Sequence, residues 1–258
     1  MKKRIAIVML LALVVFTGCV KIGEYYVGLN MQPDLTDSPF EPGLNVFGVL
    51  KCGSDFDTIN YHFEVQNMLD LQDWSTGLEV PDAQIQLTRI SSSNEALNYD
   101  LSFVEGAGYK NNSIETLPGD RWEYRCMKDS FEVTSSCIVP NLPIIDQSTV
   151  EGKEVKIIIE ADSTQFLYLV YVFQGDNVYS EFKVPQPNLT TELFISPEWE
   201  ITSSPVQVYV CAYDRQLREY QTTSNTFFKP NAFRPSFSTV NGGYGTFGAI
   251  AISTKIIE

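Results

Sequence analysis

Apolar and polar residues alternate along three stretches of this chain, at residues 59–66, 83–88 and 206–213. A period of two is the signature of a strand with one buried face, so we expect strands at these three places. Denser apolar runs at 157–159 and 166–173 predict strands that are buried on both faces. No segment keeps a helical period for three turns.

Turn-forming residues separate these stretches at short intervals, as in Pro118-Gly119-Asp120 and Gly175-Asp176-Asn177. Many short strands with turns between them favour β-sandwiches. Two prolines and a polar segment place a boundary at 140–152. We therefore expect an all-β chain with one sandwich domain at 43–145 and a second at 146–258, which includes the glycine-rich final segment.

The first 18 residues have the features of a bacterial lipoprotein signal peptide. A basic start is followed by the apolar run Ile5–Phe16, which is shorter than the roughly 20 residues needed to cross a bilayer. Phe16-Thr17-Gly18-Cys19 resembles the lipobox, in which the cysteine is lipidated and becomes the mature N-terminus. The alternative is an ordinary secretory signal with an incidental cysteine.

Cleavage before Cys19 would leave a lipidated tether at 19–42, with three prolines in its second half. No Asp follows Cys19 in Val20-Lys21-Ile22, which favours the outer membrane and leaves the face of that membrane open. We expect a protein that is attached to the membrane through its lipid.

The formal charge of the chain is −14, and it becomes more negative without the leader. The leader holds three of the 18 Lys and Arg residues and none of the 32 acidic ones, which leaves 15 basic against 32 acidic residues, a net of −17. Nucleic-acid binding relies on Lys and Arg to neutralise phosphates, so this balance argues against a nucleic-acid partner. It suits a soluble domain that stays off lipid headgroups, or one that handles cationic or neutral ligands.

Cys52, Cys126, Cys137 and Cys211 remain after the lipobox cysteine, and a secreted compartment permits disulfides. Four cysteines allow three complete pairings, among which sequence does not choose. Cys126 and Cys137 flank a plausible turn, so a disulfide between them across a hairpin is one candidate. The chain has no C-x-x-C motif for zinc or redox chemistry.

The sequence contains few candidates for catalytic residues. His62 is the only histidine, and it lies on the polar face of an alternating strand. No D-x-D-x-D-G run suggests calcium, and the residues after Gly248 read as a strand rather than the helix of a phosphate-binding loop. We expect no metal site and no cofactor. A catalytic pair of carboxylates that are distant in the sequence and close in the fold stays an open alternative.

Aromatic residues make up 12% of the chain and are the remaining lead. Tyr and Trp anchor interfaces and stack on sugar rings, although most aromatics of a sandwich are core residues. Tyr209 and Tyr213 lie on the face opposite the valines of their strand, and we take them as the candidate binding surface.

Several segments resemble uncharacterised Bacteroidetes-type outer-membrane lipoproteins, which are often encoded beside TonB-dependent, SusC-like receptors. The resemblance is carried by Leu44–Leu50, Val80–Leu87, Gly106–Tyr109, Pro118–Tyr124, Val139–Pro143 and Asn231-Ala232-Phe233. Its most specific part is Val240–Ala249, which is similar to the family's N-x-x-G-G-x-G-x-F-G-A ending, with the order at its start shifted.

The resemblance implies a transthyretin-like or immunoglobulin-like first domain, a fibronectin-like second region, and no assigned chemistry. Two functions follow. The first is a lipid-anchored, non-enzymatic binding or scaffolding module of the cell envelope, accessory to a TonB-dependent receptor. The alternative is a small carboxylate-dependent hydrolase or carbohydrate-processing lipoprotein.

Overall fold

The computed structural model describes residues 42–54, 61–67, 79–91, 93–160, 162–185, 189–201, 205–224 and 238–258. These residues form strands and one helix, so the expected all-β class is confirmed. The signal peptide, Cys19 and most of the tether lie outside the described residues. The described strands form three sheets that enclose two hydrophobic cores.

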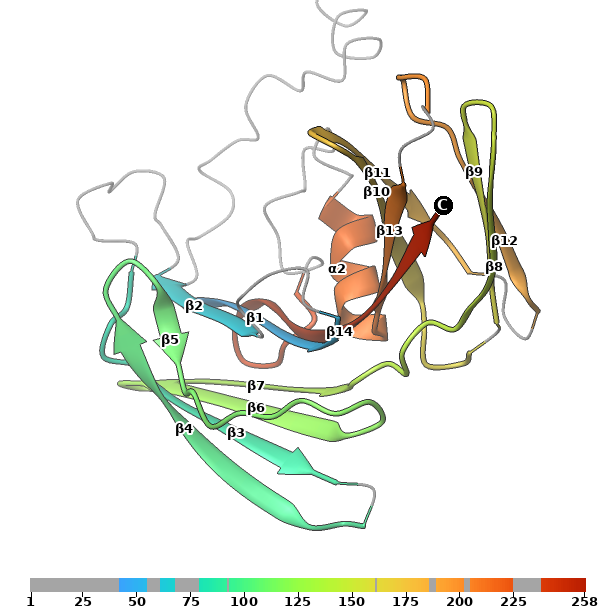
Figure 1. Cartoon of the computed structure of the whole chain (residues 1–258). Coiled ribbons are helices and arrows are strands. Elements are labelled where there is room, and N and C mark those ends of the chain that lie inside the picture. The colour runs from blue at the N-terminus through green and yellow to red at the C-terminus, as the bar shows by residue number, and fades with distance from the viewer. Residues whose placement is uncertain are drawn as a thin grey trace, which may run out of the picture. The chain divides into compact units, whose positions relative to one another are not determined.

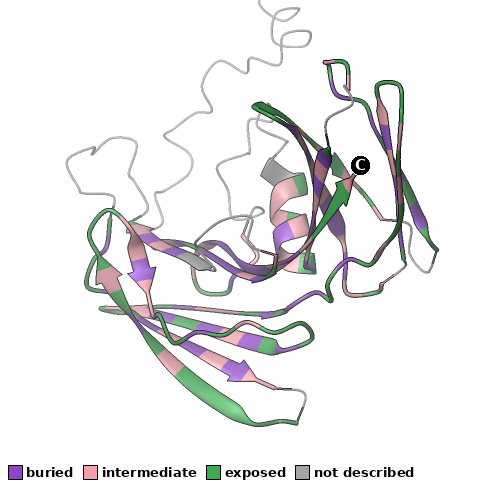
Figure 2. Ribbon diagram, in the orientation of Figure 1, coloured by how far each residue is buried: buried purple, intermediate pink, exposed green. Residues whose placement is uncertain are grey.

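The first core lies against a five-stranded sheet (Figure 1). In spatial order its strands are β5 (Gly108–Lys110), β4 (Ala96–Val104), β3 (Gln84–Ile90), β6 (Arg121–Lys128) and β7 (Phe131–Ile138). Alternation turns Ile85 and Leu87 of β3, and Trp122 and Tyr124 of β6, into the core. The exposed positions between them give the banded pattern of Figure 2.

A six-stranded sheet contributes to both cores. In spatial order its strands are β11 (Asn177–Lys183), β10 (Leu167–Gln174), β13 (Val206–Tyr213), β14 (Tyr244–Ile257), β1 (Leu44–Gly53) and β2 (Tyr61–Asn67). A three-stranded sheet completes the second core with β12 (Thr191–Ile195), β9 (Glu154–Ile159) and β8 (Ile145–Glu151).

The alternating patterns at 59–66, 83–88 and 206–213 correspond to β2, β3 and β13. In β13, for example, Val206, Val208 and Val210 are buried in the second core. The denser runs differ from the expectation of burial on both faces, because β9 and β10 each bury one face and leave the other half-exposed. The extra apolar residues of β10 therefore belong to a surface rather than to a core.

The final strand, β14, belongs to both halves of the structure. Its first part pairs in parallel with β1, and its second part pairs antiparallel with β13. We expected Phe247–Ile252 to pack into the second sandwich, and this is wrong for Phe247, Ala249 and Ala251, which lie in the first core. Parallel pairing with a strand about two hundred residues earlier leaves no local signal in the sequence.

The glycines that lead into β14 allow its close approach to other backbone. Gly245 has a φ of 101°, and a Cβ atom at this position would collide with the carbonyl oxygen of Val46 in β1. A Cβ atom on Gly242 would collide with the carbonyl oxygen of Glu132 in β7. These contacts support the interpretation of the glycine-rich ending as a tight turn into a strand.

Helix α2 (Arg215–Ser224) follows β13 directly and was not expected from the sequence. Asp214 caps it, because its Oδ1 atom accepts the backbone N–H of Leu217 at 2.9 Å. Leu217 is buried and lies against Gly248 of β14. The helix has ten mostly polar residues, with Leu217 as its one aliphatic side chain, so it falls short of the three turns over which a helical period is recognised.

Candidate binding surface

The two tyrosines singled out from the sequence lie on the face of the six-stranded sheet that is turned away from the second core. The register places Tyr171 of β10 beside Tyr209 of β13, and Phe182 of β11 beside Leu169 of β10. We call this surface the aromatic face. It comprises Tyr171, Phe173, Phe182, Tyr209 and Tyr213.

Rings of the aromatic face contact one another edge to face. Phe173 and Tyr209 have centroids 5.6 Å apart, and Phe182 and Tyr213 have centroids 6.0 Å apart. The Gln207 amide donates a hydrogen bond of 2.7 Å to the hydroxyl of Tyr209. Such contacts hold the rings in defined orientations.

Burial differs across the aromatic face. Burial raises the pKa values of Tyr171 and Tyr213, which shows that their hydroxyls are partly removed from water. Phe182 is 41% exposed, and the same face continues to the exposed Val178 and Ile256. The aromatic face is therefore exposed to solvent at Phe182, whereas Tyr171 and Tyr213 are more deeply packed.

No charged side chain of β10, β11 or β13 projects on this face. The charged residues of β11, Glu181 and Lys183, project to the opposite side because they are paired with Val170 and Tyr168. Polar groups on the face are hydroxyls, an amide and a thiol. In a chain with a formal charge of −14, an aromatic patch to which its own three strands add no charge has the composition of an interface core. Lys51 of the neighbouring β1 lies on the same side of the sheet and acts electrostatically on the Cys211 thiol.

The proposed disulfide between Cys126 and Cys137 is not formed. The hairpin register pairs Cys126 with Val133 and Cys137 with Trp122, so the two cysteines are offset along the strands beyond disulfide reach. The reason is the two-residue turn Asp129-Ser130, in which Asp129 has a φ of 52°. Cys52 and Cys211 are also free thiols, and all four cysteines are buried.

Burial makes these thiols unreactive. It raises the pKa of Cys52 and of Cys211 to about 12 and that of Cys126 to about 11. It also raises the pKa of Cys137 well above its ordinary value. Since the thiolate is the nucleophile, none of the four resembles a catalytic or redox cysteine.

A small cavity of about 170 Å³ brings two carboxylates together. It is lined by Glu64 and Glu79, with Phe103 and Tyr109 among the other lining residues. A carboxylate pair is what the hydrolase alternative requires. The volume is below the roughly 300–1,000 Å³ of small-molecule sites, and this speaks against a sugar substrate there.

A larger hollow of about 470 Å³ lies over β3, β6 and β7 and is lined mostly by hydroxyl and amide side chains. Its one carboxylate, Glu123, pairs with Arg121 at 2.9 Å. Arg125, which also lines it, pairs with Glu132 at 2.7 Å. The arrangement lacks a second carboxylate for hydrolysis and reads as a solvated sheet face.

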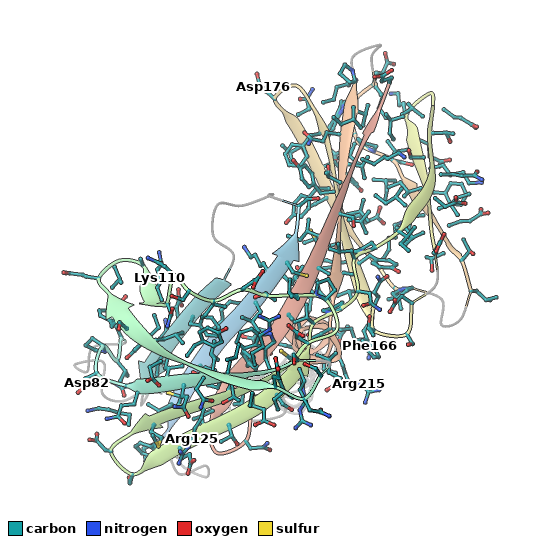
Figure 3. The ribbon with its side chains drawn as sticks, turned by 60° about the horizontal axis from the view of Figure 1, so that its bottom comes forward. Asp82, Lys110, Arg125, Phe166, Asp176 and Arg215 are labelled. Carbon is teal, nitrogen blue, oxygen red and sulfur yellow. The ribbon has the colours of Figure 1, made fainter. Side chains whose placement is uncertain are left out.

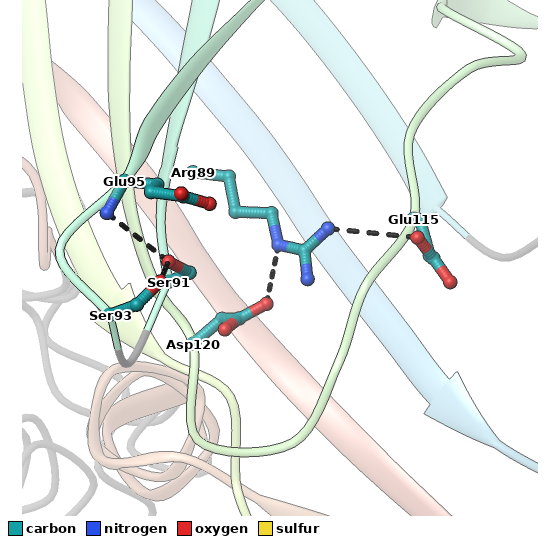
Figure 4. Close-up of polar contacts among 6 residues, drawn as sticks. All are labelled: Arg89, Ser91, Ser93, Glu95, Glu115 and Asp120. Atoms are coloured by element: carbon teal, nitrogen blue, oxygen red, sulfur yellow. Dashed lines mark hydrogen bonds and ion pairs between the residues drawn. The ribbon is translucent and has the colours of Figure 1, made fainter.

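A buried ion pair joins β3 to the segment before β6 (Figure 4). Arg89 of β3 is 9% exposed, and its Nε atom donates to Asp120 Oδ2 at 2.5 Å. Glu115 lies 3.7 Å from the same guanidinium. These contacts tie the segment before β6 to β3, so we assign the cluster a structural role.

Other expectations fall partly outside the described region. The side chain of His62 is not among the described residues. Where side chains are described, no group of three His, Cys, Asp or Glu residues is placed to hold a metal ion. In the same part of the chain, no helix has the length and apolar character of a membrane span.

Comparisons with known proteins carry no argument about the function of this chain. No family model matches the chain, and no curated protein matches it. Among solved structures, the chicken interferon gamma receptor alpha chain is similar at 10% identity and a TM-score of 0.24, over 66% of this chain and 87% of that chain.

A tetra-tandem repeat from the extending region of a large adhesion protein is similar at 12% identity and a TM-score of 0.25. The match covers 83% of this chain and 49% of that one, so the chain spans about half the length of the repeat structure. Neither likeness informs the function. The proposal below therefore rests on the residues of this chain.

Sequence reasoning found Tyr209 and Tyr213 but missed their neighbours Tyr171, Phe173 and Phe182. The first two belong to the dense apolar run at 166–173, which we assigned to a core strand. The signal that would have placed them outside the core is the alternation of valine with aromatic residues, since Val170 and Val172 are the buried set.

Proposed function

We propose that this protein is a lipid-anchored, non-enzymatic binding or scaffolding module of the outer membrane, accessory to a TonB-dependent receptor. The observation that carries the proposal is the aromatic face. It combines contacting rings and exposed apolar neighbours, and none of the side chains that β10, β11 and β13 project on this face is charged.

The composition of the aromatic face supports a protein partner. Interface cores are enriched in Tyr and Phe and depleted in charged residues relative to the rest of a surface. The rings are also held by one another, which lowers the entropy lost when a partner orders them. A receptor that buried this face would therefore gain apolar area at low cost.

The lipid anchor supports the location. The lipobox at 16–19 would hold the β-sandwiches at the membrane in which the receptor resides. The acidic surface would keep the body away from anionic headgroups. The anchor and the face together would present one uncharged patch to a neighbouring membrane protein.

The proposal is tested by receptor capture from solubilised membranes. Tyr209→Ala with Tyr213→Ala removes two rings of the face, and Ile256→Glu places a charge beside Gln207, its pairing partner in β13. Both variants are expected to weaken capture of the receptor. A half-buried ring costs roughly half of the 3–5 kcal/mol of a core truncation, so the double variant needs a check of its melting temperature.

Two exposed apolar residues on other strands, Leu97 of β4 and Phe194 of β12, supply the matched control. Leu97→Ala with Phe194→Ala should leave capture unchanged. The charge of Ile256→Glu lies at a position that is 59% exposed, so this variant should fold even if the tyrosine pair does not. Full capture by Ile256→Glu would contradict the proposal.

A further inference from the structure

Strand β11 forms an edge of the six-stranded sheet, and only β10 pairs with it among the described residues. A two-residue turn, Gly175-Asp176, joins the two strands, with Asp176 at the hairpin tip (Figure 3). The closing pair of such a hairpin is hydrogen-bonded, and bonding then alternates along the ladder. The N–H and C=O groups of Val178, Ser180 and Phe182 therefore point away from the sheet.

The other strands at sheet edges are shielded or short. Strand β7 is hydrogen-bonded to Asn241, β2 is bridged by Glu79, and β8 has a register shift between Ile145 and Gln147. Strands β5 and β12 have three and five residues. Proteins shield edges in these ways because an open edge is a template for another strand.

Within the described part of the chain, strand β11 has none of these protections. It has seven residues, no proline and an unbroken register with β10. Its outward-facing residues, Val178, Ser180 and Phe182, are exposed (Figure 2). The two charges of the strand neutralise each other, since Lys183 Nζ lies 2.6 Å from Glu181 Oε1.

We propose that β11 pairs antiparallel with β11 of a second copy of this chain, about a two-fold axis at Ser180. In this register Val178 lies opposite Phe182 of the other copy, twice, on the aromatic side of the sheet. All three outward-facing residues then form hydrogen-bonded pairs, on the order of six inter-chain bonds.

The charges of the strand favour this register over its neighbour. About Ser180, Glu181 lies opposite Tyr179 of the second copy, and Lys183 lies opposite Asn177. A shift of one residue in the centre, to Glu181, would place the two Glu181 side chains directly opposite each other, which is unfavourable. The strand is thus complementary to itself under two-fold symmetry, the commonest symmetry of homo-oligomers.

The pairing uses the backbone edge of β11 and, of the aromatic face, only Phe182, so it leaves the rings of β10 and β13 to the receptor of the proposed function. It would align the aromatic faces of two copies on one continuous sheet. A dimer would then present two receptor-binding surfaces, with the gain in avidity that bivalency gives.

The experiment uses the full chain, purified in detergent, with Ser180→Cys and the control Ser102→Cys, which places a thiol on an exposed position of β4. Cα atoms of a hydrogen-bonded antiparallel pair are about 5.5 Å apart, within disulfide reach. Mild oxidation should link Ser180→Cys into dimers while Ser102→Cys stays monomeric. The native thiols at Cys52, Cys126, Cys137 and Cys211 are buried and should not compete.

Sedimentation of Ser180→Pro supplies the second measurement. The proline removes an N–H that points away from β10, so the fold is expected to survive while the dimer is lost. A parent chain that is monomeric throughout, with both cysteine variants linked equally slowly, would overturn the proposal. A monomeric parent that loses receptor capture on Ser180→Pro would also overturn it, in favour of strand addition by the receptor.

Discussion

Asp214 is a buried carboxyl whose ionisation should set how stability changes with pH. It lies between β13 and α2 and is 3% exposed. Its Oδ1 atom accepts the N–H of Leu217, whereas its buried Oδ2 atom has no hydrogen-bond partner. Gly248 passes so close that a Cβ atom there would lie 2.7 Å from Oδ1. The ionised carboxylate would therefore lose its bound water on burial and gain few hydrogen bonds in exchange.

Burial raises the pKa of Asp214 from 3.8 to about 7. Near it, Glu219 of α2 adds a repulsive charge, and the thiol of Cys137 in β7 stays neutral. Because the folded pKa is the higher one, the folded state retains a proton that the unfolded state has lost between about pH 4 and pH 7. This contribution to stability is present below pH 4 and is lost as pH rises through 7.

The magnitude follows from the two pKa values. A difference between 3.8 and about 7 corresponds to roughly 4 kcal/mol in the free energy of unfolding. Of this, about 2–3 kcal/mol is lost between pH 5 and pH 8. Asp214→Asn keeps the shape and the acceptor for Leu217 but does not ionise. Its stability relative to the parent should therefore rise by about 2–3 kcal/mol between these pH values.

Urea unfolding followed by tryptophan fluorescence, at pH 5 and pH 8, measures this difference. Asp162→Asn is the matched control, because burial acts to raise the pKa of Asp162 but hydrogen bonds from Thr164 and Asn141 bring it below the ordinary value. That carboxylate stabilises the fold above its unfolded pKa, so its loss should cost the same at both pH values. An Asp214→Asn effect that is identical at pH 5 and pH 8 would refute the reasoning.

Three further predictions concern the anchor and the last strand. Cys19→Ala should release the protein from membranes or leave an uncut precursor, and membrane-bound, processed protein would contradict the lipobox. Gly245→Ala should lower the melting temperature far more than Gly152→Ala, because both have positive φ but only Gly245 would clash, with Val46. Deleting 240–258 should abolish cooperative unfolding, since β14 supplies both cores and each large buried side chain contributes about 1.5–3 kcal/mol. A deletion variant that melts like the parent would show the strand to be dispensable.

The strands were predictable where one face of the sheet is buried and the other is polar. Strand β13 shows this, because its valines alternate with residues of other kinds and all of its valines are buried. Strand β10 was predicted as a strand but not as a surface, since both of its faces are apolar. Periodicity reports burial only when the two faces differ in polarity.

The pairing of strands that are distant in the sequence, and the exact register of paired strands, could not be predicted from the sequence. The parallel contact between β1 and β14 joins the two ends of the described chain. The β6–β7 register depends on a two-residue turn at Asp129-Ser130, and this offset separates Cys126 from Cys137. Asp214 was missed as well, although an aspartate before a helix is a recognised cap, because α2 is polar and shorter than three helical turns.

Photo-crosslinking in intact cells tests the central claim most directly. A photoreactive phenylalanine analogue at Ile256, on the aromatic face, is compared with the same analogue at Leu97, which is similarly exposed on β4. The account predicts a covalent adduct with a TonB-dependent outer-membrane receptor from Ile256 and none from Leu97. Membrane-anchored protein that gives no receptor adduct from Ile256, or equal adducts from both positions, would contradict it.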